Sequence, residues 1–113
     1  MTVDDIRNFG ADTECGLKRV MGSADFYIRL VKMMPNDHNF QLLYDSIASN
    51  DLDKAFEACH ALKGALGNLS LTALYQPIEE LTEHLRARTQ MDYTPYVERI
   101  RKLHNELTEL CSK

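Results

Sequence analysis

The chain has 113 residues, of which 44% are hydrophobic, and its formal net charge at pH 7 is −4. This length provides one compact domain with a single core, so we expect residues 1–113 to form one domain. The thirteen Lys and Arg residues are dispersed, which argues against a basic stripe for nucleic acid, and no segment approaches the roughly 20 apolar residues that span a bilayer.

Charged side chains occupy the first 20 residues, where a secretory signal would be apolar: Asp4, Asp5, Arg7, Asp12 and Glu14. We therefore expect a cytoplasmic protein that does not bind membranes. Cys15, Cys59 and Cys111 are widely spaced and odd in number. This spacing favours reduced thiols over a disulfide framework or a zinc site, and we expect no bound metal.

The N-terminal part of the chain has few apolar residues before Ser23, and they predict one or two short helices that cover an end of the core: Ile6, Phe9, Leu17 and Val20. Ser23 is a suitable N-cap for a helix that contains Leu30 and Val31, and a second helical pattern extends from Phe40 to Ile47. Pro35 lies between them, so this region forms either one long kinked helix or two helices.

Three further amphipathic helices follow. Apolar residues recur at spacings of three and four from Leu52 to Leu69, after Asp51 as N-cap, and again from Leu71 to Leu85, after Ser70 as N-cap. Thr94–Pro95 is a cap followed by a first helical residue, ahead of a third apolar stripe that reaches Leu110. Together these elements predict an all-α fold: an antiparallel four-helix bundle with one or two short N-terminal helices.

His60 stands in the predicted helix that begins at Leu52, within the segment His-Ala-Leu-Lys-Gly-Ala-Leu-Gly-Asn. At ~100° per residue, His60, Gly64 and Gly67 share a face roughly 130° from the centre of the leucine stripe, with Lys63 at its edge. His60 is therefore predicted to face solvent.

The two glycines need a physical reason, because glycine inside a helix costs on the order of 1 kcal/mol relative to alanine. One reason is close packing of another helix of the same protein. The other is access, because missing side chains beyond His60 leave its ring open to a second protein. Gly64 and Gly67 share the face of His60, which favours access.

The chemistry of this face suits phosphoryl transfer. A neutral imidazole has a ring nitrogen that can attack phosphorus without a dedicated base, and the ammonium of Lys63, one turn along, can approach phosphoryl oxygens. No glycine-rich nucleotide loop or P-loop is present. We therefore expect a carrier of phosphoryl groups with no ATP-dependent kinase activity of its own.

The sequence resembles the histidine phosphotransfer (HPt) family, whose motif is a histidine followed by x-Leu-Lys-Gly and further small residues. The residues that match are His60, Leu62, Lys63 and Gly64, followed by Gly67 and Asn68. Two departures are Ser70, where many relatives have glycine, and Pro35, which falls inside what is usually one long helix.

The resemblance implies that His60 accepts a phosphoryl group from a receiver-domain aspartate and passes it to another receiver, with Lys63 assisting. Gly64, Gly67 and Asn68 would then belong to the partner surface. Relatives often place a polar residue on the next helix that hydrogen-bonds the phosphoaccepting ring; Thr82 is the candidate, and its alternative is an ordinary solvent-facing threonine. We expect a monomer whose partners are response-regulator receivers and a hybrid sensor kinase, with magnesium supplied by the receiver and no cofactor of its own.

The main alternative is a noncatalytic helical adaptor that binds receiver or kinase domains without phosphate turnover. Such an adaptor has no need of an exposed nucleophile beside a cation and a gap, so His60 with Lys63 and Gly64 favours the carrier. The other polar candidates have simpler interpretations. His38, His84 and His104 lack metal-ligand spacing and are interpreted as surface or partly packed residues, and Glu79, Glu80 and Glu83 as a solvated helix face.

Overall fold

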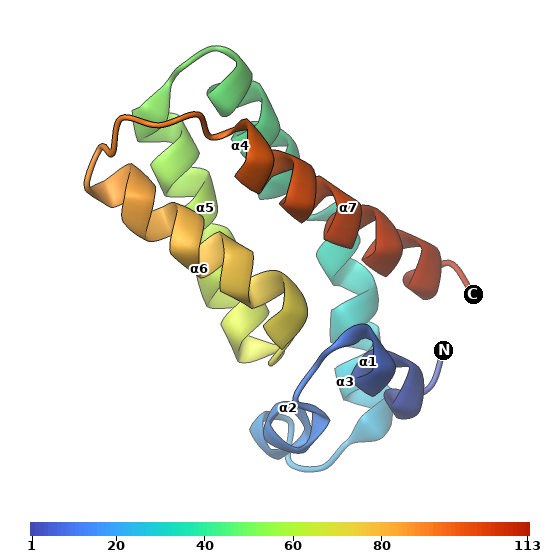
Figure 1. The fold of residues 1–113 in the computed structure, drawn as a ribbon. Coiled ribbons are helices and arrows are strands. Elements are labelled where there is room, and N and C mark those ends of the chain that lie inside the picture. Colours follow the sequence, from blue (N-terminus) through green and yellow to red (C-terminus); the bar gives the residue numbers. More distant parts are fainter.

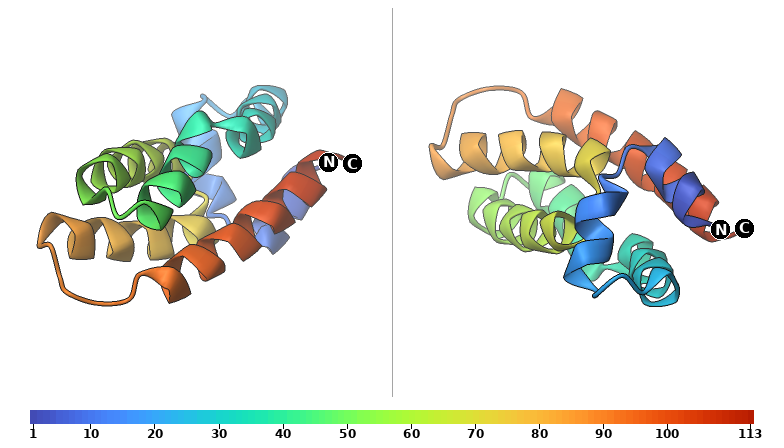
Figure 2. Two further views of the ribbon diagram at one scale, coloured as in Figure 1. Left: turned by 90° about the horizontal axis from the view of Figure 1, so that it is seen from above. Right: turned by 90° about the horizontal axis from the view of Figure 1, so that it is seen from below.

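The computed structural model describes all 113 residues, which form helices joined by turns (Figure 1). The helices are α1 (Val3–Phe9), α2 (Thr13–Arg19), α3 (Ala24–Met33), the 3-10 turn η1 (Met34–Asn36), α4 (His38–Ala48), α5 (Leu52–Asn68), α6 (Thr72–Arg86) and α7 (Thr94–Cys111). The predicted all-α bundle is confirmed, and of the one or two short N-terminal helices expected the structure has two, α1 and α2. Helices α4 to α7 alternate in direction, and each packs against the next along the chain (Figures 1 and 2).

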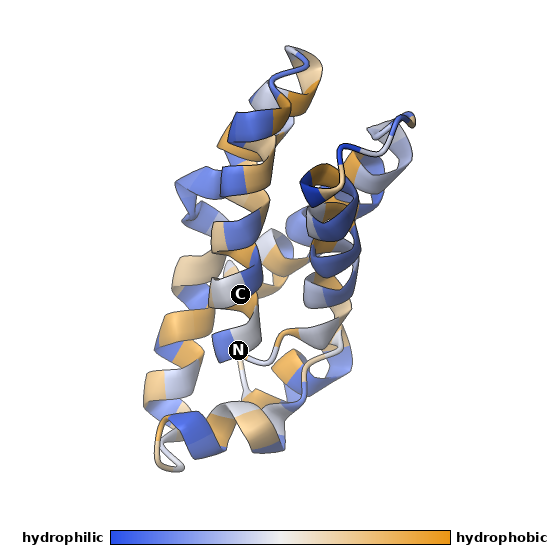
Figure 3. Cartoon of the chain, turned by 90° about the vertical axis from the view of Figure 1, so that its left-hand side faces the viewer, coloured by the Kyte–Doolittle hydropathy of each residue, from blue (hydrophilic) through white to orange (hydrophobic).

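The apolar stripes predicted for the long helices meet in one core. Twenty-two hydrophobic residues are buried there, and α5 contributes Ala55, Ala58, Cys59, Leu62 and Leu66. Figure 3 shows apolar and polar positions interspersed along the helices, as expected for amphipathic helices around a single core. No helix is both long enough and apolar enough to cross a membrane.

The break at Pro35 divides the chain into two helices. Met34–Asn36 forms a 3-10 turn, and Asp37 then caps α4 by accepting a hydrogen bond from the backbone N–H of Asn39 at 2.9 Å. Proline has no N–H and its ring hinders the preceding turn, so a continuous helix is unfavourable here. The alternative of two helices is therefore correct.

His104 of α7 holds this break against the bundle. Its Nε2 lies 2.8 Å from the carbonyl oxygen of Pro35, and its Nδ1 lies 2.9 Å from the hydroxyl of Tyr44. The imidazole also stacks on the ring of Phe40, with ring centroids 3.8 Å apart. His104 is thus a packed structural histidine.

The predicted helix starts are partly confirmed. The carboxylate of Asp51 accepts a hydrogen bond from the N–H of Lys54 at 3.1 Å and caps α5, and the hydroxyl of Ser23 accepts one from the N–H of Phe26 at 3.3 Å and caps α3.

Two predicted caps are wrong. Leu71 is the N-cap of α6, while Ser70 has a φ of 54° and its carbonyl accepts a hydrogen bond from the N–H of Asp12. Thr94 is the first residue of α7, and its N–H donates to the carboxylate of Asp92 at 3.0 Å.

The N-terminal helices close over the turn between α5 and α6. The N–H of Asp12 donates to the carbonyl of Ser70 and the N–H of Ala73 donates to the carbonyl of Gly10, both at 2.9 Å. The Tyr27 hydroxyl of α3 donates to the carbonyl of Leu69 at 2.7 Å. These contacts place α2 beside the C-terminal end of α5, where it forms one wall of the site (Figure 2).

Candidate functional site

His60 lies on the exposed side of α5, opposite the stripe that enters the core. Its neighbours Cys59 and Leu62 are fully buried, whereas the His60 side chain is exposed. The imidazole stacks on Phe56, one turn earlier, with ring centroids 5.8 Å apart and ring planes 20° apart. Its solvent-facing position, predicted from helical spacing alone, is the one the structure shows.

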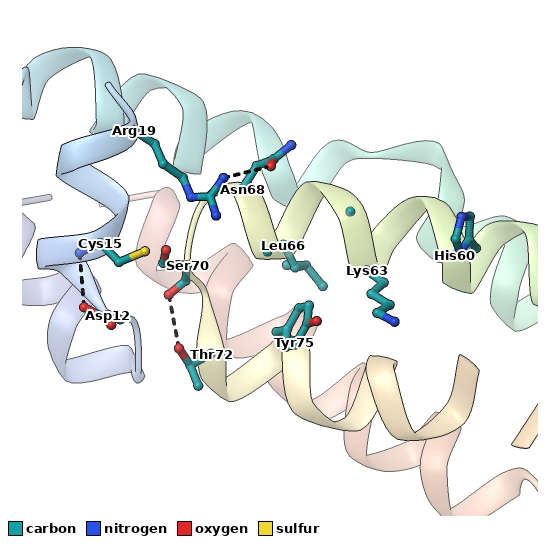
Figure 4. A pocket seen from close by; sticks show the side chains of 12 residues that line it. Asp12, Cys15, Arg19, His60, Lys63, Leu66, Asn68, Ser70, Thr72 and Tyr75 are labelled. Carbon is teal, nitrogen blue, oxygen red and sulfur yellow. Dashed lines mark hydrogen bonds between the residues drawn. The ribbon is translucent and has the colours of Figure 1, made fainter. Parts of the chain in front are cut away.

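A groove of about 570 Å³ extends from His60 along α5 toward α2 (Figure 4). Lys63 and Gly64 line it next to His60, while Arg19 and Cys15 of α2 line its far end. Three helices form its walls, since Tyr75 of α6 also borders it. The groove therefore leads directly to the imidazole and is open to solvent.

Lys63 does not extend freely into solvent. Its side chain is 27% exposed, and its Nζ lies 3.9 Å from Oε1 of Glu83 on α6. In Figure 4 the lysine side chain points from α5 toward α6. The positive charge expected beside His60 is present, but it forms an ion pair with Glu83 of the neighbouring helix.

The two glycines differ in their surroundings. A Cβ added at Gly64 would have no heavy atom within 4 Å, so the missing side chain leaves open space one turn beyond His60. A Cβ added at Gly67 would lie 3.3 Å from Cε2 of Tyr75. Open access therefore describes Gly64, whereas Gly67 allows the Tyr75 ring to pack against α5.

The expected hydrogen bond between Thr82 and the phosphoaccepting ring is not present. Thr82 is fully buried, and its hydroxyl donates to the carbonyl of Ile78 at 2.6 Å. Thr82 lies one turn from Ile78 and from Leu85, which both face the core, so it shares their face of α6. The alternative interpretation, a solvent-facing threonine, is also wrong because Thr82 is fully buried.

Asn68 ends α5 at the far side of the groove. Its side chain is exposed, and its Oδ1 accepts a hydrogen bond from Nη1 of Arg19 at 3.4 Å. This contact joins α2 to α5 within the wall of the groove. Asn68 is therefore accessible from outside, as a residue of a partner surface must be.

A comparison with protein-family models matches the Hpt domain to residues 34–113, which include η1, α4 to α7 and the His60 helix. The chain belongs to the Hpt domain family. Hpt domains transfer phosphoryl groups in two-component phosphorelays, as phosphocarriers that interact with receiver domains and kinases. No curated protein and no solved structure matches the chain.

Three further residues of this Hpt domain are connected to His60, directly or through its neighbours, and the sequence predicted no role for them at the site. Phe56 stacks under the imidazole, the guanidinium of Arg86 lies 5.0 Å from the centroid of the Phe56 ring, and Glu83 pairs with Lys63. Helical spacing would have indicated Phe56, four residues before His60. Glu83 and Arg86 lie on α6, so only the packing of α6 on α5 reveals them.

Two cysteines of the chain have pKa values shifted in opposite directions. The hydrogen bond to Ser70, with a further contribution from Arg19, lowers the pKa of the Cys15 thiol, which lines the groove. Burial raises the pKa of the Cys59 thiol to about 12. Cys59 thus acts as a small core residue.

Proposed function

We propose that His60 accepts a phosphoryl group from the aspartyl phosphate of one receiver domain and passes it to the aspartate of another. The observation that carries this proposal is the exposed imidazole at one end of a groove, on a helix whose opposite side is fixed in the core. A rigid helix presents the nucleophile in one place, and the receiver supplies the rest of the site, including magnesium.

In the proposed transfer, the lone pair of an imidazole nitrogen forms a P–N bond. The P–O bond to the receiver aspartate breaks, and its electron pair leaves on the carboxylate. Onward transfer reverses this exchange, since the P–N bond breaks toward the ring nitrogen while a P–O bond forms at the second aspartate. No net oxidation or hydrolysis takes place.

Lys63 and Gly64 support this chemistry in different ways. The Lys63 ammonium, one helical turn from His60, offers a positive charge to the phosphoryl oxygens. The open space at Gly64 allows the receiver to approach the ring closely. Lys63→Ala is expected to slow transfer by about tenfold or less, because one partly exposed ion contact is typically worth ~1 kcal/mol.

The test is incubation with purified receiver domains that carry radiolabelled phosphate. Wild-type protein should acquire acid-labile, base-stable label, and His60→Gln should acquire none while its thermal melt stays nearly unchanged. His38→Gln is the matched control, because the His38 side chain is 86% exposed and lies outside the groove. Equal labelling of His60→Gln would refute the assignment, and receiver binding without labelling would support the adaptor alternative.

A further inference from the structure

Glu83 is the only carboxylate paired with the lysine beside His60. Its Oε1 lies 3.9 Å from Nζ of Lys63, and its Oε2 lies 3.4 Å from Nε of Arg86. Glu83 is half-exposed, whereas the Lys63 side chain is 27% exposed. The carboxylate therefore joins two cations, one on α5 and one on its own helix.

Arg86 helps to fix the position of this carboxylate. Its guanidinium lies over the Phe56 ring, and the same ring stacks on His60. The contacts thus run in sequence from His60 to Phe56, Arg86, Glu83 and Lys63, which is again one turn from His60. Because α6 supplies both Glu83 and Arg86, the packing of α6 on α5 decides where the Lys63 ammonium rests.

A phosphoryl group on His60 would place a charge of about −1.5 to −2 one turn from Lys63. The ammonium cannot neutralise the phosphoryl oxygens fully while it remains paired with Glu83. We propose that Glu83 is a positioning residue that holds Lys63 against α6 and competes with the phosphoryl group for it, so that phosphohistidine is less stabilised than Lys63 alone would allow. This inference rests on the proposed function, since it concerns phosphorylated His60.

The competition has a direct equilibrium consequence. A nearby cation favours the doubly charged form of the phosphoryl group over its singly protonated form. Glu83→Gln removes the competing charge and keeps the shape of the side chain. The midpoint at which the phosphoryl group takes up its last proton should then move to lower pH.

The experiment is a phosphorus NMR titration of the intact protein after phosphorylation of His60 with phosphoramidate. For Glu83→Gln we expect a midpoint about 0.5 pH unit below that of the wild type, roughly a threefold change in the proton affinity, as is typical of a half-exposed ion pair. Lys63→Met should move the midpoint upward. In the Lys63→Met background, Glu83→Gln should have little further effect, because Glu83 acts through Lys63.

Glu80→Gln is the matched control. Glu80 lies on the same helix, is 53% exposed against 55% for Glu83, and pairs with Arg99 of α7 at 3.8 Å. An unchanged titration midpoint in Glu83→Gln would overturn the proposal. An equal shift of the midpoint in Glu80→Gln would also overturn it, as would a full shift caused by Glu83→Gln in the Lys63→Met background. Each variant is also melted thermally to verify that it is folded.

The outcome can be separated from that of the proposed function. Phosphoramidate is a chemical donor, so the titration needs no receiver. Absence of label from every phospho-receiver would count against the carrier function, whereas a labelled protein with an unchanged Glu83→Gln titration would count only against the role of Glu83.

Discussion

Replacing Gly64 with alanine should make the domain more stable, because the added methyl group meets nothing and the helix gains a better helix former. A Cβ at this position has no heavy atom within 4 Å, so no steric cost offsets the gain in propensity. Glycine in a helix interior is less favourable than alanine by about 0.5–1 kcal/mol. The unfolding entropy is about 2.1 cal/mol/K per residue, so for 113 residues this corresponds to a rise in Tm of about 2–4 °C.

Differential scanning calorimetry of the wild type and Gly64→Ala measures this rise. Gly67→Ala is the comparison, because its added methyl group would lie 3.3 Å from the Tyr75 ring and part of the same gain should be lost in moving that ring. A lower Tm for Gly64→Ala, or a larger gain at Gly67 than at Gly64, would refute the reasoning.

The same position separates stability from function. Side chains of a helix lean toward its N-terminus, so a leucine at position 64 would cover the surface of the preceding turn, where His60 lies. Gly64→Leu should therefore fold normally and still transfer phosphate at least tenfold more slowly than wild type, as measured by the time course of labelling. Wild-type kinetics in a folded Gly64→Leu protein would show that the glycine does not provide access.

Three further predictions concern the rest of the molecule. Gly16→Ala should destabilise the domain by about 1–3 kcal/mol in denaturant titrations, since its methyl group would lie 2.6 Å from the buried Tyr27 ring; an unchanged midpoint would contradict this packing. Burial raises the pKa of both Tyr27 and Tyr44 to about 12, above the usual value near 10 in the unfolded chain. The folded state therefore favours the neutral hydroxyls, and the stability that these two tyrosines contribute is complete below pH 10 and is lost as the pH rises toward 12. Thermal melts between pH 9 and 12 should show the loss, and Tyr44→Phe should reduce it. Iodoacetamide at pH 8 should alkylate Cys15 well before Cys59, because the pKa of Cys15 is lowered and that of buried Cys59 is raised. Mass spectrometry of the digested protein measures the order, and alkylation of Cys59 first would contradict the prediction.

Helical periodicity was sufficient to predict most of the fold. The apolar residues from Leu52 to Leu69 recur at spacings of three and four residues, so a regular helix places them on one side and His60 on the other. Asp51 and Ser23 were predicted as caps correctly because capping depends on local backbone geometry. The motif around His60 likewise indicates the Hpt family from residues within a single helix, so its detection needs no tertiary contact.

The sequence mispredicts the roles of Ser70 and Thr82, because in each case the residue type suggests one role and the packing of the chain gives it another. Ser70 resembles an N-cap, but the carbonyl groups at the turn between α5 and α6 pair with the N-terminal segment, and Ser70 adopts a left-handed conformation there. Thr82 is polar, yet its hydroxyl is satisfied by the carbonyl of Ile78, so it can be buried on the core face of α6.

The immediate surroundings of His60 were decided by tertiary structure alone. The sequence determined that α5 presents His60, Lys63 and Gly64 along one side, because these positions depend only on the helical repeat. The pairing of Lys63 with Glu83 and the contact of Gly67 with Tyr75 depend on the rotation and register of α6 against α5. That register is set by the interlocking of many buried side chains from both helices, a collective property that no short pattern in the sequence encodes.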